Sequence, residues 1–312
     1  MTIIVILVAL LVKADRGRHD ANYAFTNYDK SFSGWGDFTF FIGLLPSAYT
    51  FSAVGMISSM AEQTAQPAVK VPRAISLAVP VEFISGLLFI LPICFTMPPL
   101  EELITATYGQ ALPTLFRSVI GSDAGAFGLL FLVLVLTMCC SFSITTASSR
   151  VTCAFARDNA IPLSRLWYRI DERTGVPVYA FVLVNIIQVL LSHVYLGSPL
   201  AFTAFVSVGI MALSVSYAIP VVIGLFHGRR EVDSARFTCG HALGTFVNLV
   251  AICWIAFEVV LFSMPMVLPV TPSSMNYASV VLVGFATISA AWYFIHARKV
   301  YKGPPDSDGI GY

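Results

Sequence analysis

Long apolar stretches separated by short charged loops dominate the pattern along this chain. Seven stretches of about twenty or more residues contain almost no charged side chains: Phe38–Ala61, Ala74–Thr96, Ala124–Ala147, Val178–Leu196, Phe202–Phe226, Leu243–Met264 and Tyr277–His296. A helix rises about 1.5 Å per residue, so each stretch is long enough to cross a hydrocarbon layer about 30 Å thick. The pattern predicts an all-α membrane protein, a polytopic helical bundle that forms a single transmembrane domain over residues 1–312.

Composition agrees with this prediction and excludes several classes of protein. Hydrophobic residues make up 57% of the chain and charged residues only 11%, whereas a soluble domain has roughly 25% charged residues. A net charge of +1 offers no field that would capture nucleic acid. The six cysteines lack the paired spacing of a zinc site or a disulfide framework, so we expect no metal and no cofactor. No nucleophile motif or phosphate-binding loop indicates an enzyme.

The apolar segment Thr2–Val12 is too short to span a membrane. As a helix it would be about 16 Å long, and only Met1 precedes it, so the basic region of a signal peptide is missing. We expect this segment to be the last part of a span. A short interfacial segment is the alternative.

Lys and Arg residues gather in alternate loops, and this asymmetry predicts the orientation of the chain. Cations near span ends resist translocation, so the richer side should face the cytosol. One side carries thirteen of the 18 cations: Lys70, Arg73, Arg150, Arg157, Arg165, Arg169, Arg173, Arg229, Arg230, Arg236, Arg298, Lys299 and Lys302. The other side carries Lys13, Arg16, Arg18, Lys30 and Arg117. We therefore expect a cytosolic C-terminal tail over residues 297–312.

The first long stretch contains residues that interrupt helices. Within Phe38–Ala61, the residues Gly43, Pro46 and Gly55 relax the backbone or remove a helical hydrogen bond. We expect this span to break near its middle, where freed peptide groups and half-helix ends would hold a small charged or zwitterionic solute. The alternative is a kinked structural helix whose hydroxyl groups bond neighbouring turns.

Two carboxylates, Glu82 and Glu258, lie inside predicted spans. A carboxyl group at membrane depth costs several kcal/mol unless it is paired, hydrated or protonated, which makes it a functional candidate. No cation shares this depth, and burial favours the protonated form. Both residues are therefore candidates for proton coupling, and the alternative is a protonated or water-facing group with a local packing role.

Hydroxyl and amide side chains form two further polar stripes. Ser141, Thr145 and Ser148 share one face of their span, where they would either coordinate an ion or bond back to helix carbonyls. Asn185 and Gln188 share a face of the next span, and we expect them to bond a neighbouring helix.

Three blocks of sequence resemble the amino-acid/polyamine/organocation permeases. The runs YTFSAVGMISSMAEQ (Tyr49–Gln63) and QPAVKVPRA (Gln66–Ala74) look like the sixth helix of that family and the loop after it. ASSRVTCAFARDNAIP (Ala147–Pro162) is similar to the cytosolic end of the eighth helix in the fungal choline and GABA permease branch. PVTPSSMNYA (Pro269–Ala278) and the later YKGP (Tyr301–Pro304) form the third match, and the resemblance covers nearly the whole chain.

The resemblance implies a partial inverted-repeat transporter fold. The full family has twelve helices and holds its solute between the broken first and sixth helices; here Thr2–Val12 corresponds to the end of the fifth helix, so the first four helices are missing. Tyr49–Gly55 corresponds to the unwound centre of the sixth helix, with backbone groups facing the solute and aromatic walls suited to an amine. The implied substrate-binding residues are Tyr49, Thr50, Phe51, Ser52, Ala53, Val54 and Gly55.

The same resemblance implies roles on the cytosolic side. Arg150, Arg157 and Asp158 match the family's signature there and are expected to anchor and gate the inner side, together with Glu62. Attraction to lipid headgroups is the alternative role for these charges. Met56 stands where many amino-acid permeases have an acidic residue, which favours the choline-like branch.

The sequence therefore predicts a secondary active permease of amino acids, GABA or choline-like small amines. We expect proton coupling, with Na⁺ as the other possible ion, and alternating access in the plasma membrane. Ser141 and Thr145 join Glu82 and Glu258 as coupling candidates. The competing hypothesis is a truncated membrane protein that does not transport, since a site built from two helices cannot close when one is absent.

Overall fold

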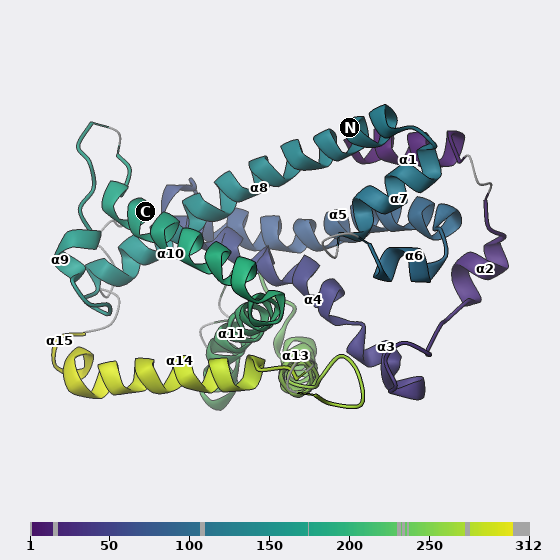
Figure 1. Cartoon of the computed structure of the whole chain (residues 1–312). Helices are drawn as coiled ribbons and strands as arrows, with labels where there is room; N and C mark the ends of the chain where they lie inside the picture. Colours follow the sequence, from purple (N-terminus) through teal and green to yellow (C-terminus); the bar gives the residue numbers. More distant parts are fainter. Residues whose placement is uncertain are drawn as a thin grey trace. The chain divides into compact units, whose positions relative to one another are not determined.

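The computed structural model describes residues 2–14, 18–106, 110–173, 175–229, 232, 235, 237–271 and 275–301, apart from the side chains of residues 62, 63, 199 and 200. Within this part, the chain forms helices, turns and loops and contains no strand, which confirms the predicted all-α class (Figure 1). The Glu62 side chain, Arg230, Arg236 and the tail from Lys302 onward lie outside the described part.

Seven helices in the described part are long and apolar enough to cross a membrane, and each overlaps one predicted stretch. They are Gly36–Ala61, α5 (Pro67–Thr96), α8 (Asp123–Arg157), α10 (Val178–Gly197), a segment within α11 (Pro199–Phe226), α13 (His241–Leu261) and Ala278–Val300. Their apolar side chains remain largely exposed, as in a protein whose helices face lipid. Two helices are longer than expected, since α5 begins at Pro67 and α8 continues to Arg157.

The described helices group into two compact units, and the boundaries between them fall after Asp29, within α5 and within α8. The first unit comprises Met1–Asp29 and Ser76–Ile144, and it contains α1 (Thr2–Val12), α2 (Ala21–Thr26), α6 (Leu100–Ile104) and α7 (Ala111–Ile120). Its core is formed by side chains of α1, α7 and α8: Ile6, Leu10, Leu115, Phe116, Val119, Ala126 and Leu129. The short apolar segment at the N-terminus is thus a helix with one face packed into this core.

The second unit comprises Lys30–Ile75 and Thr145–Tyr312. Its central helix is α11, which contacts α4 (Leu45–Ser52), α10, α13 and α14 (Ala278–Trp292). The core lies where these helices meet: Leu45, Val208, Ile210, Met211, Leu261, Phe262 and Ala278. The remaining short elements are η1 (Gly36–Phe38), α3 (Thr39–Ile42), η2 (Ala53–Gln63), α9 (Ser164–Trp167), the π-helical η4 (Tyr293–Ala297) and α15 (Arg298–Val300).

The span Gly36–Ala61 is interrupted, but it does not unwind where we expected. Helix α3 ends at Ile42, α4 runs from Leu45 to Ser52, and the backbone then tightens into the 3₁₀-helix η2 from Ala53 onward. The hydroxyl groups of Ser58 and Ser59 each donate a hydrogen bond of 2.7 Å to the carbonyl oxygen three residues earlier. The segment Tyr49–Gly55, which we expected to be unwound, is therefore helical and contains a change of helix type after Ser52.

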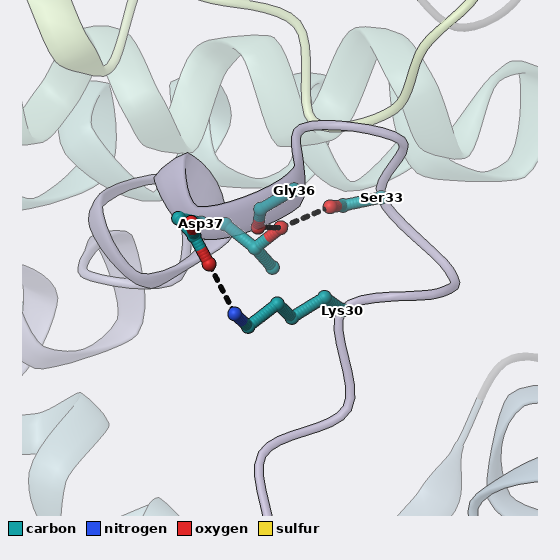
Figure 2. A network of polar contacts seen from close by, with 5 residues as sticks. Lys30, Ser33, Gly36 and Asp37 are labelled. Carbon is teal, nitrogen blue, oxygen red and sulfur yellow. Dashed lines mark hydrogen bonds and ion pairs between the residues drawn. The ribbon is translucent and has the colours of Figure 1, made fainter.

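A small polar network holds the chain just before this span (Figure 2). Lys30 forms an ion pair with Asp37, and Thr39 donates a hydrogen bond of 2.7 Å to the carbonyl oxygen of Gly36. The hydroxyl groups of Ser33 and Thr39 also bond each other. These contacts close the turn from which η1 and α3 begin.

The same turn is attached to the loop that follows α13. The indole N–H of Trp35 donates to the carbonyl oxygen of Pro265 at 3.0 Å. The backbone N–H of Leu268 donates to the carbonyl oxygen of Ser33 at 2.8 Å. Gly34 adopts a left-handed φ of 73°, and a Cβ atom there would lie 2.8 Å from the carbonyl oxygen of Leu268. The start of the broken span is thus fixed against the loop that follows α13 by close backbone contact.

Candidate functional site

A cavity of about 300 Å³ lies in the second unit among α4, α11 and α13. This size falls at the lower end of the range for small-molecule sites, about 300–1,000 Å³. Its aromatic walls are Phe51, Tyr217, Trp254, Phe257 and Phe262. Its polar groups are Ser47, Ser52, Ser214 and Glu258. The cavity is therefore mostly apolar, with a few polar groups that converge on it.

Glu258 is the only carboxylate that lines this cavity in the described part of the chain, and no Lys, Arg or His joins it there. The residue is 6% exposed, and the Ser214 hydroxyl donates a hydrogen bond of 3.1 Å to its Oε1. A buried carboxylate without a cation is costly. A proton or a cationic solute would remove that cost.

Glu82, the other carboxylate within a span, lies on the part of α5 that belongs to the first unit. Its side chain is half-buried, and its buried Oε2 atom has no hydrogen-bond partner among the described residues. The nearby Ser85 hydroxyl donates to the backbone carbonyls of Val81 and Glu82. The structure thus places the two carboxylates in different units, and only Glu258 lines the cavity described above.

The point where α4 becomes η2 is closed by Tyr217 from α11. Its hydroxyl donates a hydrogen bond of 3.3 Å to the carbonyl oxygen of Ser52. A Cβ atom added to Gly55 would lie 2.3 Å from Cζ of this ring. Only glycine fits at position 55 while the ring stays in place, so the helix and the ring approach each other more closely than any side chain permits.

The predicted binding segment contributes unevenly to the cavity. Phe51 and Ser52 line it. Tyr49 is 58% exposed and does not line it, so the aromatic wall expected from this residue is supplied by other helices. Thr50 and Ala53 are exposed, and Val54 and Gly55 are half-buried beside the cavity-lining pair.

Sequence reasoning missed Tyr217, Trp254 and Phe257, although their spacing carries a signal. Trp254, Phe257 and Glu258 follow an i, i+3, i+4 pattern on α13, and Ser214 and Tyr217 are three residues apart on α11. Residues at these spacings share one helix face. The carboxylate and its aromatic neighbours could therefore have been assigned to one surface before the structure was known.

Most hydroxyl and amide side chains of the two polar stripes form hydrogen bonds within their own helices or with a neighbouring helix. Ser141 donates back to the carbonyl oxygen of Met138 at 2.8 Å, and Asn185 donates to that of Phe181, also at 2.8 Å. Gln188 of α10 donates to the buried hydroxyl oxygen of Thr145 of α8 at 3.4 Å. Of these contacts, only the bond between Gln188 and Thr145 joins two helices, and neither Ser141 nor Thr145 lines the cavity.

The charges expected on the cytosolic side lie at the end of α8, away from the cavity lining. Arg157 and Asp158 form an ion pair with 3.5 Å between Nε and Oδ1. Arg150 is half-buried, and its Nε atom has no hydrogen-bond partner among the described residues. The predicted role of Glu62 concerns a side chain outside the described part.

Comparisons with known proteins converge on one family. A family model described as amino acid permease matches residues 1–286. An uncharacterized amino-acid permease of Schizosaccharomyces pombe is 35% identical over 308 residues, covering 97% of this chain and 56% of the relative. The choline transporter of Saccharomyces cerevisiae is 32% identical over 292 residues, covering 93% and 51% of the two chains.

A polyamine transporter of Saccharomyces cerevisiae is 30% identical over 310 residues, covering 98% of this chain and 50% of that protein. The chain thus spans little more than half the length of these curated relatives. No solved structure matches it.

Proposed function

The chain belongs to the amino acid permease family, and from this premise we propose that it forms the solute-binding part of a secondary transporter for small amines or amino acids. The observation that carries the proposal is the cavity among α4, α11 and α13, where buried Glu258 faces a group of aromatic rings. A carboxylate attracts an ammonium group by charge, and aromatic faces attract the same group by cation–π contact. The relatives that are named choline and polyamine transporters support this choice of solute class.

We assign the solute's ammonium group to the Glu258 end of the cavity. The remainder of the solute would lie along Phe51 and Ser52, next to the peptide groups of Ala53 and Val54 where α4 becomes η2. Tyr49, Thr50 and Gly55 belong to the same segment, and their role would be to hold its backbone in the conformation that the solute contacts. A change of helix type at this point leaves carbonyl groups with altered hydrogen bonding, which a polar solute can use.

Proton coupling is the second part of the proposal. When no solute is bound, a proton on Glu258 would remove the cost of a buried charge, and a cationic solute would replace it. Glu82 is a second coupling candidate, because its buried Oε2 atom is unsatisfied among the described residues. If Na⁺ were the coupling ion instead, hydroxyl ligands such as Ser141 and Thr145 would be needed.

The orientation belongs to the proposal as well. We place the protein in the plasma membrane, with the end of α8 and the C-terminus in the cytosol. Transport there would proceed by alternating access. Arg150, Arg157, Asp158 and Glu62 would then anchor and gate the inner side. An epitope after Tyr312 should be reached by antibody only in permeabilised cells, and labelling of intact cells would reverse the orientation.

The transport test compares cells that express this chain with cells that express a version carrying additional N-terminal sequence. Uptake of labelled choline, GABA and amino acids is measured with and without a pH gradient. We expect the longer version to accumulate at least one of these solutes only while the gradient is present. If the longer version reaches the membrane and moves none of them, the proposed function is wrong, and a non-transporting membrane protein becomes the better description.

A further inference from the structure

A second cavity, of about 590 Å³, lies in the second unit at the ends of α8 and α14. One wall is the segment from Asn159 to Arg169, which includes α9, and the other runs from Trp292 to Val300 through η4. The indole N–H of Trp292 donates a hydrogen bond of 3.0 Å to the carbonyl oxygen of Ala160, which joins the two walls. No proposed transport role uses this cavity.

The polar side of this cavity is cationic. Arg165, Arg169 and His296 line it, and no Asp or Glu does so in the described part of the chain. The two guanidinium groups make no hydrogen bond or ion pair with a described residue, whereas the nearby Arg157 is paired with Asp158. Two unpaired arginines on one concave surface are suited to bind a phosphate group, because each presents a planar fork of donors.

A neighbouring cavity provides the contrast. It is lined by Arg169 and Arg173 together with the carboxylates Asp171 and Glu172. That cavity carries charges of both signs, and Arg169 lies between the two cavities and lines both. The cationic character is thus specific to the cavity between α9 and η4, and Arg165 belongs to that cavity alone.

The other side of the cationic cavity is apolar. Ile161, Leu163, Leu166 and Val300 line it, and Leu163 is 71% exposed in a left-handed conformation with φ of 57°. The cavity also adjoins the ends of two helices that are long and apolar enough to cross a membrane, and there the Trp292 ring is tilted against that of His296, with 4.9 Å between the ring centroids. Tryptophan is enriched at this depth of a membrane, at the level of the headgroups.

From these observations we propose that the cavity binds the phosphate-bearing headgroup of an anionic phospholipid. Arg165 and Arg169 contact the phosphate, and Leu163 and Leu166 contact the glycerol and the upper part of the acyl chains. A free phosphate ion would use the guanidinium groups but not the apolar wall. Basic pockets at the ends of membrane helices are suited to lipid headgroups for this reason.

The test uses the full chain purified in detergent and needs no transport measurement. Short-chain phosphatidylinositol phosphate, phosphatidylserine and phosphatidylcholine, and separately inorganic phosphate, are titrated while the thermal unfolding midpoint is recorded. We expect the two anionic lipids to raise the midpoint and phosphatidylcholine and inorganic phosphate to leave it unchanged. Arg165→Gln should weaken the apparent affinity for anionic lipid about fivefold, and adding Arg169→Gln should weaken it further.

Two variants separate the site from general charge attraction. Arg173→Gln removes a cation from the same loop but outside this cavity, and its affinity should stay within about twofold of the parent. Leu163→Asp places a negative charge on the exposed apolar wall and should abolish the lipid response without changing the midpoint of the lipid-free protein. The proposal is wrong if inorganic phosphate raises the unfolding midpoint as much as anionic lipid does, or if no lipid shifts the midpoint. It is also wrong if Arg173→Gln weakens the affinity for anionic lipid as much as Arg165→Gln does.

Discussion

The ring of Tyr217 lies against the backbone of Gly55, so that a Cβ atom at position 55 would come within 2.3 Å of Cζ and 2.5 Å of the hydroxyl oxygen. The same hydroxyl donates to the carbonyl oxygen of Ser52 at 3.3 Å. One aromatic side chain of α11 thus contacts both sides of the point where α4 becomes η2. This contact couples the central helix of the second unit to the interrupted span, beside the proposed solute cavity.

A larger residue at position 55 should abolish transport and leave membrane insertion intact. Gly55→Leu would displace the Tyr217 ring and alter the cavity, because a side chain at position 55 would clash with the ring. Gly43→Ala is the matched control in the same span, since a Cβ atom there meets only carbonyl oxygens at 3.5 Å. Uptake by the transporting form and its surface expression are measured together. Normal uptake by Gly55→Leu would show that the solute site lies elsewhere.

Removal of the Tyr217 ring should partly rescue the smaller substitution Gly55→Ala. Each single change disturbs the same contact, so their effects should not add, as is usual for residues that touch. We expect the double variant Gly55→Ala/Tyr217→Ala to transport at least as well as Gly55→Ala alone. If the double variant loses transport by the product of the two single losses, the two residues act independently.

The sequence was sufficient to predict which segments are helices that span a membrane. Length and composition are local properties, and the seven helices of suitable length overlap the seven predicted stretches. The site was harder to predict because it depends on which faces meet. Tyr49 was expected as an aromatic wall, yet its side chain is 58% exposed, and Tyr217 and Trp254 from helices distant in the sequence line the cavity instead.

Helix type was also beyond the reach of the sequence pattern. Glycine and proline correctly indicated an interrupted span at Phe38–Ala61. They did not indicate that the chain continues as a 3₁₀-helix from Ala53, because the two helix types differ in the register of their backbone hydrogen bonds, which composition does not specify.

The hydrogen bond between Gln188 and Thr145 should contribute to the stability of the folded protein and should not affect the dependence of uptake on Na⁺. Thr145→Val keeps the shape of the side chain and removes the hydroxyl oxygen that accepts from Gln188 at 3.4 Å. Interhelical hydrogen bonds in membranes are worth about 0.6 kcal/mol on average, so the unfolding midpoint should fall slightly. Ser141→Ala, whose hydroxyl bonds within its own helix, is the control. A loss of Na⁺-dependent uptake in Thr145→Val would instead support ion binding at this residue.

The turn before the interrupted span should be sensitive to substitution of Gly34. Gly34→Ala introduces a left-handed non-glycine residue, which costs about 1–2 kcal/mol, and places its Cβ atom 2.8 Å from the backbone carbonyl oxygen of Leu268. Gly36→Ala carries a similar conformational cost at φ of 59° but meets no atom within 4 Å. The thermal midpoint in detergent should therefore fall further for Gly34→Ala. Equal losses would show that the contact with Leu268 contributes nothing.

Neutralising the carboxylate in the cavity should weaken solute recognition and uncouple uptake from the pH gradient. Glu258→Gln keeps the size of the side chain and an oxygen that can accept from Ser214, so the packing of α13 should be preserved. A hydrogen bond to a charged group is worth about 1.5–3 kcal/mol, so KM for a cationic amine should rise at least about tenfold.

Ser214→Ala tests the same interaction from the other side. It removes the donor to Glu258 Oε1 and keeps the carboxylate, so the rise in KM should be smaller, about fivefold for 1 kcal/mol. Glu101→Gln neutralises an exposed carboxylate on α6, outside the cavity, and should leave uptake unchanged. Glu258→Gln removes both the negative charge and the group that can take up a proton. Unchanged KM and unchanged response to the gradient in that variant would therefore exclude Glu258 from both solute binding and proton coupling, and Glu82 would become the remaining carboxylate to test within the spans.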